Sequence, residues 1–268
     1  MDYLSIYGIA ALVILGMMVA IWLLSLYLKD ASIVDIFWGT GFVIIAWVYF
    51  FLAPDGFIGR KLLIASLDTI WGLRLSIHIL IRNWGHGEDF RYQKWRQESG
   101  KSWWWFSFFK VFALQGFLMW VISIPLLVAQ FSPLPARLVW LDYLGLLFWA
   151  IGFFFEAVGD WQLSRFKANP DNQGKLLNTG VWRYTRHPNY FGDAAQWWGF
   201  YFIAAAAGGF WSIFSPIIMT LLLRNVSGVA MLEKTLSNTK PGYQEYVETT
   251  NAFIPWFPKQ NKSSEHRS

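Results

Sequence analysis

The sequence predicts an all-α integral membrane protein, built as a bundle of about seven transmembrane helices. Of its 268 residues, 55% are hydrophobic and 20% aromatic, whereas only 15% are charged. A soluble domain carries about 25% charged residues. The mean hydropathy is +0.34, and the 18 tryptophans and 24 phenylalanines are typical of aromatic belts at both membrane interfaces.

Seven apolar stretches are each near the roughly 20 residues that cross a bilayer as a helix. A short turn at Gly208 and Gly209 separates the last two, and the first stretch is too long for a cleaved signal peptide. We expect one transmembrane domain over 1–258, with its core motif region at 138–258, and a disordered polar tail over 259–268. The stretches are 3–28, 33–53, 61–81, 103–129, 138–163, 190–207 and 210–232.

The distribution of the 22 lysines and arginines predicts the orientation of the chain. If the N-terminus lies outside, only Arg60, Lys61 and Arg137 fall in outer loops, and most of the others fall in inner loops or in the tail. Cytoplasmic loops carry the excess of Lys and Arg. We therefore expect the C-terminus and both long polar loops, 82–102 and 164–189, to face the cytoplasm.

Composition also excludes several classes of chemistry. The chain has no cysteine, which excludes disulfides, thiolate metal sites and cysteine catalysis. The formal net charge is +5, but the cations sit beside apolar spans, so anionic headgroups or an anionic ligand are expected in place of nucleic acid. There is no GxGxxG, GxxxxGK[ST] or HExxH motif, and no two of the four histidines have a metal-ligand spacing. No metal is expected.

A dense polar cluster at 180–193 lies between two strongly apolar stretches. Ionisable groups at a membrane boundary are costly and mark a functional site by default. The alternative is a solvated basic loop that follows the topology rules. The polar residues of the cluster are Arg183, Arg186, His187, Asn189 and Asp193.

Pro188 suits the first turn of a helix, so a helix is expected to begin at His187 or Pro188. Its free amides and positive dipole end would suit a phosphate or a carboxylate at the cytoplasmic side. Arg183 and Arg186 would add bidentate contacts to phosphate. These features together predict an anion-binding cavity at the cytoplasmic end of the bundle.

Polar residues inside the spans recur at helical spacing. Two pairs are four residues apart, so the members of each pair share a helix face. Charges within a membrane normally pair, so these residues either hold the bundle together by salt bridges or line a polar site, and the two roles are compatible. The residues are Arg74 and His78, Glu156 and Asp160 with Arg165 and Lys167 after them, and Arg224 in the last span.

At 186–193, RHPNYFGD, the chain resembles a superfamily of intramembrane enzymes. It is similar to the C-terminal domain of the steroid 5α-reductases, to the sterol reductases, and to bacterial membrane proteins that carry this domain. The same superfamily includes the isoprenylcysteine carboxyl methyltransferases, which bind S-adenosylmethionine. Other similar segments are 32–39 (SIVDIFWG), 71–78 (WGLRLSIH), 85–92 (GHGEDFRY), 155–160 (FEAVGD), 232–234 (LEK) and 241–243 (PGY).

Asn189 and Asp193 favour the reductases over the methyltransferases. The reductases have Asn-x-x-Gly followed by an acid here, whereas a methyltransferase more often has Ser or Gln at the first position and an aromatic or apolar residue at the second. An amide can pair with the carboxamide of nicotinamide, one donor against one acceptor. The resemblance thus implies NADPH as cofactor, with S-adenosylmethionine as the alternative.

The resemblance also implies a set of cofactor-facing residues. Within it, His78 stands where the reductases usually have a tyrosine, Glu156 replaces an asparagine and Lys167 replaces an arginine. The set is Arg74, His78, Glu156, Asp160, Arg165, Lys167, Arg183, Arg186, His187, Asn189, Tyr190, Asp193 and Arg224.

The Glu–Tyr pair that holds the steroid carbonyl in the 5α-reductases has no clear counterpart. Asp35, the nearest buried acid in the N-terminal half, and Tyr190 are the candidate catalytic groups. The implied function is NADPH-dependent reduction of an activated carbon–carbon double bond in a steroid-, sterol- or enoyl-like substrate, in a bacterial inner membrane. The alternatives are a membrane methyltransferase acting on a lipid or prenylated substrate, and a non-enzymatic lipid-binding protein. The oligomeric state is left open.

Overall fold

The computed structural model describes residues 1–226, 228–229, 232–233, 236 and 240–259, and within this part of the chain every regular element is a helix. Two compact units are present. The first comprises Met1–Tyr143 and Phe200–Ser215, and the second comprises Leu144–Gly199 and Pro216–Ser268. The predicted tail, 259–268, lies outside the described residues except for Lys259.

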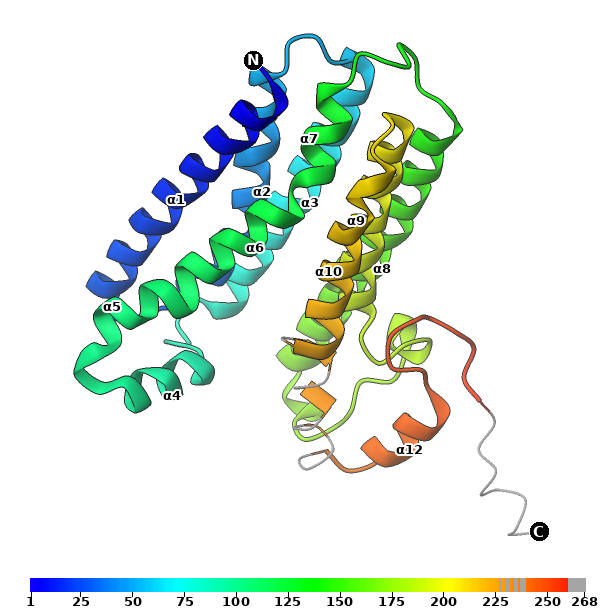
Figure 1. Ribbon diagram of the computed structural model, residues 1–268. Coiled ribbons are helices and arrows are strands. Elements are labelled where there is room, and N and C mark those ends of the chain that lie inside the picture. Colours follow the sequence, from blue (N-terminus) through cyan, green and yellow to red (C-terminus); the bar gives the residue numbers. More distant parts are fainter. Residues whose placement is uncertain (227, 230–231, 234–235, 237–239, 260–268) are drawn as a thin grey trace. The chain divides into compact units, whose positions relative to one another are not determined.

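The α-helices are α1 (Tyr3–Leu28), α2 (Ile33–Leu52), α3 (Ile58–Asn83), α4 (Phe90–Ser99), α5 (Trp103–Ser107), α6 (Leu114–Ile122), α7 (Ile124–Phe131), α8 (Trp140–Ala168), α9 (Pro188–Ala206), α10 (Phe214–Leu221) and α12 (Tyr243–Thr249). Figure 1 shows α1, α2, α3, α6 and α7 of the first unit running as one bundle. The π-helical turns are Phe108–Ala113 and Leu222–Val226.

Within the described residues, five helical segments are long and apolar enough to cross a membrane, which confirms the predicted integral membrane bundle. The other two predicted spans are also helical, at α9 and, as far as it is described, at Phe210–Val226, which is apolar but shorter. The five segments are Tyr3–Leu28, Ile33–Leu52, Ile58–Asn83, Phe90–Phe131 and Trp140–Ala168.

The outer faces of these segments carry large apolar side chains. On α1, Leu4, Leu12 and Leu23 are all exposed, although water would not favour them. Such a surface suits lipid tails, because a bilayer core is as apolar as leucine. The lipid bilayer is therefore the environment of this protein, as the composition predicts.

Glycine contacts bring α2 and α3 together in the first unit. A Cβ added at Gly72 would lie 2.5 Å from the carbonyl oxygen of Gly39, and one added at Gly39 would lie 2.2 Å from the carbonyl oxygen of Gly72. Small residues of this kind let membrane helices approach to backbone contact. The side chain of Thr40 donates to Ser76 Oγ over 2.8 Å and adds a polar tie at the same place.

Arg60 and Lys61 correct the predicted distribution of cations, which counted both in an outer loop. Helix α3 begins at Ile58, so both lie in its first turn, and both are buried. The Arg60 guanidinium donates to Asp142 from Nε over 2.8 Å and from Nη2 over 3.1 Å. Lys61 Nζ donates to the carbonyl oxygen of Ala53 over 2.6 Å. These partners allow both cations to be buried. Counting the charges of the predicted loops cannot reveal such partners.

Close glycine contacts also join α8 and α9 in the second unit. A Cβ at Gly152 would lie 2.4 Å from the carbonyl oxygen of Gly192, and the reverse distance is also 2.4 Å. About two turns of α8 further on, the ring of Trp182 donates to the carbonyl oxygen of Gly159 over 3.1 Å. The segment before α9 is thus anchored on α8.

The chain after α12 packs on the same segment. The amide of Arg186 donates to the carbonyl oxygen of Asn251 over 2.9 Å, and the amide of Trp256 donates to that of Tyr184 over 2.9 Å. The hydroxyl of Thr185 donates to the carbonyl oxygen of Phe253, also over 2.9 Å. Residues 184–187 are therefore held from the C-terminal side as well as from α8.

Candidate functional site

Helix α9 begins at Pro188, as predicted. Just before it, the amide of His187 donates to the hydroxyl oxygen of Thr185 over 3.3 Å. Arg186 and His187 are both buried. The polar cluster at 180–193 is therefore not a solvated loop, because its central cation and its imidazole are inside the second unit.

Glu233 is the residue on which this cluster converges. Nε of Arg186 donates to Glu233 Oε1 over 2.8 Å, and Nη2 lies 2.6 Å from the same oxygen. Nε2 of His187 lies 3.2 Å from it. Partial burial acts to raise the pKa of the Glu233 carboxyl, but the hydrogen bonds from His187 and Arg186 outweigh it and hold this pKa below its usual range.

The rest of the Arg186 guanidinium is also held by protein atoms. Its Nη1 donates to the carbonyl oxygens of Val247, over 3.2 Å, and Thr250. A buried arginine that binds a carboxylate and two carbonyl groups ties the segment before α9 to α12. This geometry gives Arg186 a structural role, and its predicted contact with a cofactor phosphate stays a prediction.

Two acid–amide pairs lie deeper between α8 and α9. Nδ2 of Asn189 donates to Asp160 Oδ1 over 3.1 Å, and Nε2 of Gln196 donates to Glu156 Oε2 over 2.5 Å. Glu156 and Asp160 are 2% and 6% exposed. The structure thus brings together three residues of the predicted set and adds Gln196, which sequence reasoning missed.

Helical spacing is the signal that would have found Gln196. It lies three residues after Asp193 and seven after Asn189, so all three share one face of α9. Asp193 is also buried. This face is polar inside an otherwise apolar helix, and it meets the carboxylates of α8.

The other predicted residues of the second unit lie further out. Tyr190 is half-buried, and its ring centroid lies 5.9 Å from that of His187. Arg224 corrects a prediction: it was expected to be buried in the last span, but it is exposed in the π-helical turn Leu222–Val226, where the α-helical stretch has already ended. Three predicted cations, Arg165, Lys167 and Arg183, are exposed. The guanidinium of Arg165 lies 5.2 Å from the ring centroid of Trp161.

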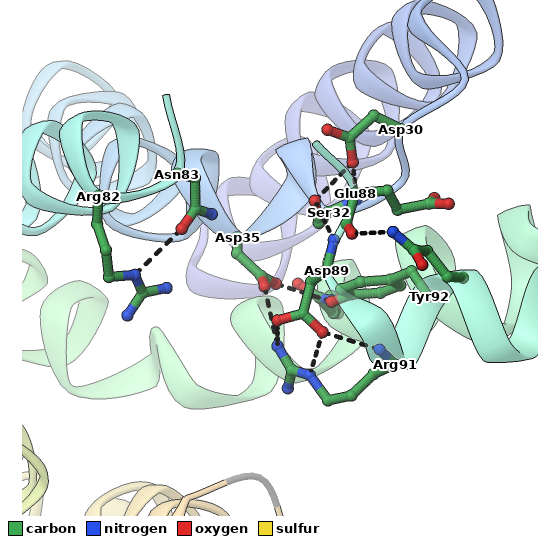
Figure 2. Close-up of polar contacts among 11 residues, drawn as sticks. Asp30, Ser32, Asp35, Arg82, Asn83, Glu88, Asp89, Arg91 and Tyr92 are labelled. Carbon is green, nitrogen blue, oxygen red and sulfur yellow. Dashed lines mark hydrogen bonds and ion pairs between the residues drawn. The ribbon is translucent and has the colours of Figure 1, made fainter. Parts of the chain in front are cut away.

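In the first unit, Asp35 is held by two side chains of α4 (Figure 2). The hydroxyl of Tyr92 donates to Asp35 Oδ1 over 2.8 Å, and Nη2 of Arg91 donates to Asp35 Oδ2 over 3.4 Å. Nε2 of Gln115 donates in turn to the Tyr92 oxygen over 3.3 Å. The predicted acid is therefore oriented by a hydroxyl and a guanidinium.

Asp89 caps α4 and positions Arg91. It accepts from the amide of Arg91 and from its Nε, both over 2.9 Å. Burial acts to raise the pKa of the Asp89 carboxyl, but the hydrogen bonds from Arg91 outweigh this effect and lower it. Asp89 is thus a carboxylate that fixes the guanidinium facing Asp35.

Glu88 fastens α4 to the turn before α2. It accepts from the amide of Ala31 over 2.7 Å, and from Nη2 and Nε of Arg96 over 2.8 and 2.9 Å. Sequence reasoning assigned no role to Glu88, Arg91 or Tyr92, although the segment 85–92 was among those that resemble the reductases. The contacts described above explain why an acid, an arginine and a tyrosine occur close together in this segment.

Arg74 and His78 lie on α3 in the first unit, where both are half-buried. Their spacing of four residues puts them on one face of that helix. Among the described residues there is no group of three or more His, Cys, Asp or Glu side chains that could hold a metal ion. The roles of Arg74 and His78 on a cofactor stay predictions.

The fold and these clusters define a helical integral membrane protein with buried acid–amide pairs. The chain belongs to the family described as "Protein of unknown function (DUF1295)", which matches residues 21–250 and so covers both clusters. It is similar to "Uncharacterized protein C594.04c" of Schizosaccharomyces pombe, with 24% identity over 266 residues, 88% of this chain and 75% of that protein. No solved structure matches the chain.

Proposed function

We propose that this protein is a membrane reductase that uses NADPH to reduce an activated carbon–carbon double bond in a lipid-soluble substrate. The resemblance of 186–193 to the steroid 5α-reductases and sterol reductases supports this reading. So does the family match, because it includes that segment. We place the nicotinamide of the cofactor along the polar face of α9, in the second unit.

The single observation that carries the proposal is an unpartnered amide oxygen on that face. Gln196 is fully buried; its Nε2 is used by Glu156, and its Oε1 has no hydrogen-bond partner. A buried acceptor without a donor costs about 1–3 kcal/mol. The carboxamide of nicotinamide brings an amine donor and a carbonyl acceptor, so it can satisfy this oxygen and exchange hydrogen bonds with Asn189.

The start of α9 suits the phosphates of such a cofactor. The start of a helix is its positive end, which favours an anion. In α9 this dipole carries the argument, because Pro188 has no amide hydrogen and the amides of Tyr190 and Phe191 already donate to Asn189 Oδ1 and to the carbonyl oxygen of His187. Arg165, Lys167 and Arg183 are exposed cations on the flanking segments and supply the surplus charge that a 2′-phosphate needs. This surplus is the reason for proposing NADPH over NADH.

When bound, NADPH supplies the hydride. The residues of this chain would hold the substrate carbonyl and supply a proton. Tyr190 and Asp35 are the candidates, because the Tyr190 hydroxyl, or the Asp35 carboxyl in its protonated form, can donate a hydrogen bond to the carbonyl as enolate charge develops. Tyr92 and Arg91 orient Asp35 and keep its carboxyl in one position.

We further propose that the N-terminus lies outside and the C-terminus in the cytoplasm of a bacterial inner membrane. This orientation follows from the Lys and Arg of the predicted loops, even with Arg60 and Lys61 removed from the outer side, because the outer count then falls further. It gives the loops around 82–102 and 164–189 access to cytoplasmic NADPH.

Identification of a co-purified nucleotide by mass spectrometry tests the proposal. The protein would be extracted in mild detergent, denatured, and its released small molecules analysed. We expect NADPH or NADP⁺ in amounts that fall with Asn189→Ala but not with Glu248→Gln, an exposed substitution on α12. S-adenosylmethionine or its demethylated product would instead assign a methyltransferase, and lipid alone would assign a lipid-binding protein.

A further inference from the structure

Asp68 lies near the middle of α3 and is fully buried in the first unit. Neither of its carboxyl oxygens has a hydrogen-bond partner. Residues one turn away on the same face, Ala65 and Trp71, are also buried and carry no charge. An acid inside a membrane span is a functional-site hypothesis by default, and the reductase proposal does not use this one.

Asp142 shows what a buried aspartate in the same unit looks like when it is paired with an arginine. It is as fully buried as Asp68. Its oxygens accept from Arg60 Nε over 2.8 Å, from Arg60 Nη2 over 3.1 Å, and from the amide of Val139 over 2.8 Å. Asp68 has no such set of donors, so the two carboxyls differ in what neutralises them.

A second unpartnered oxygen lies at the level of Asp68. Gln130, fully buried on α7, donates from Nε2 to the carbonyl oxygen of Ala46 over 3.1 Å, and its Oε1 has no partner. Gly72, one turn after Asp68, packs against Val43 on the antiparallel α2. Ala46 lies about one turn beyond Val43, so helical geometry puts it level with Asp68. Helix α7 packs on both α2 and α3.

Two further ionisable groups on these helices are engaged elsewhere. Lys61 on α3 donates to the carbonyl oxygen of Ala53, and its Nζ lies 4.6 Å from the ring centroid of Phe50. The hydroxyl of Tyr49 on α2 lies 2.8 Å from Ser123 Oγ. Helix α7 contains no charged residue.

This level of the first unit therefore offers three acceptor oxygens without a partner, and the buried indole Nε1 of Trp71, on the same face of α3, is a donor that carries no charge. A bare carboxylate taken out of water without partners is too costly to persist, and such a group neutralises instead. Neither Asp68 nor Gln130 lines the cavity of about 240 Å³ bounded by Tyr3, Phe131 and Trp211, so this cavity brings them no ligand. A proton occupies almost no volume. Bound to Asp68, it removes the negative charge of the carboxylate and turns one carboxyl oxygen into a hydrogen-bond donor.

We propose that Asp68 is a proton-binding site: a neutral carboxylic acid whose hydroxyl is directed to Gln130 Oε1, directly or through one water. The proton is held on oxygen and no bond between heavy atoms changes. The chemistry is that of a carboxylic acid–amide pair within the first unit. This inference stands apart from the reductase proposal, and neither depends on the other.

Infrared spectroscopy at neutral pH tests it, because solvated carboxyls are then ionised and lack the C=O stretch of an acid. We expect an acid band that shifts with ¹³C-labelled aspartate in the unaltered protein. This band should vanish in Asp68→Asn, move in Gln130→Leu and persist in Asp142→Asn. An acid band that is absent from the labelled protein, or unchanged by Asp68→Asn, would overturn the proposal.

Melting temperatures give a second, independent readout. Asp68→Asn replaces a neutral acid by a neutral amide of the same shape and should melt within a few degrees of the parent. Asp142→Asn leaves Arg60 buried without its counter-charge and should melt lower by on the order of 10 °C. If Asp68→Asn melts as low as Asp142→Asn, or abolishes a stabilisation by Na⁺ over choline, then Asp68 is an ionised ligand of a cation and not a bound acid.

Discussion

Nη2 of Arg186 lies 2.6 Å from Oε1 of Glu233, although the two residues are far apart in the chain. Arg186 stands just before α9, and Glu233 follows the π-helical turn that ends at Val226. His187 shares the same carboxylate oxygen. Glu233 therefore holds the entrance of α9 in place and neutralises the buried cation beside it.

Replacing Glu233 by glutamine should destabilise the second unit. The substitution keeps the shape but removes the negative charge that Arg186 and His187 share, so we expect a loss of about 1–3 kcal/mol in the free energy of unfolding. Thermal unfolding in detergent measures it. Glu248→Gln on α12, which alters an exposed side chain, is the matched control and should melt like the parent.

The same carboxylate predicts an acid limit of stability. Its pKa is lowered in the folded protein from an ordinary value of 4.5, so the folded state binds fewer protons than the unfolded state. The stabilisation is complete above pH 4.5 and is lost as the pH falls through the lower, folded value. Between these pH values the parent should lose stability more steeply than Glu233→Gln. Parallel pH profiles of the two would contradict this role.

Adding one methyl group between α2 and α3 should disrupt the first unit. In Gly72→Ala the new Cβ would lie 2.5 Å from a backbone oxygen of Gly39, which cannot move aside like a flexible side chain. We expect a loss of about 1–3 kcal/mol, or failure to accumulate in the membrane. Gly8→Ala on α1, where nothing lies within 4 Å of the new atom, is the control. Equal stability of the two variants would mean that this contact does not exist.

Asp35→Asn should separate chemistry from cofactor binding. The amide keeps the volume but cannot supply a proton, so we expect turnover to fall by at least about tenfold while NADPH binding is unchanged. Tyr92→Phe, which removes one hydrogen bond to Asp35, should have a smaller effect of the same kind. NADPH oxidation with a panel of lipophilic enones measures turnover. Full turnover in Asp35→Asn would leave Tyr190 as the remaining candidate acid.

The proposed orientation predicts where reporters will be found. A reporter at the C-terminus and tags inserted near Gly100 and Gln173 should all read cytoplasmic, because the Lys- and Arg-rich loops face that side. Cysteine accessibility is a convenient readout, since the chain has no cysteine of its own. If a tag in either loop is found on the external side, the proposed cofactor site faces a compartment without NADPH, and the proposal fails.

Sequence alone predicted the spans well, because a run of apolar residues long enough to cross a bilayer leaves few alternatives. It also predicted the first residue of α9, since Pro188 marks a helix start by its own geometry. It missed α4 inside the predicted loop 82–102, because that helix is polar and depends on its cap, Asp89, and on Glu88.

Long-range partners were the other limit. The acid that pairs with Arg186 lies beyond α9 and α10, and the face of Gln196 becomes visible only once α8 is known to cover it. Arg60 and Lys61 were counted as loop cations because their partners, Asp142 and the carbonyl of Ala53, are set by tertiary structure. The pattern of apolar and polar residues along the sequence predicts which residues are helical, but it does not predict which buried charged side chains pair with each other.

Direct titration of ligand binding to the α9 face tests the central proposal most sharply. In a thermal-shift assay, NADPH at one hundred times its dissociation constant should stabilise the parent by about 2.7 kcal/mol, and S-adenosylmethionine should do far less. Asn189→Ala and Asp193→Ala should each weaken NADPH binding by about ten- to one hundred-fold, or roughly 1.4–2.8 kcal/mol. Asn189→Ala also removes the donor to the buried Asp160, which lowers the melting temperature of the ligand-free protein, so the affinity of the folded protein is the quantity compared. Stabilisation by S-adenosylmethionine alone, or parent-like NADPH affinity in both variants, would contradict the account.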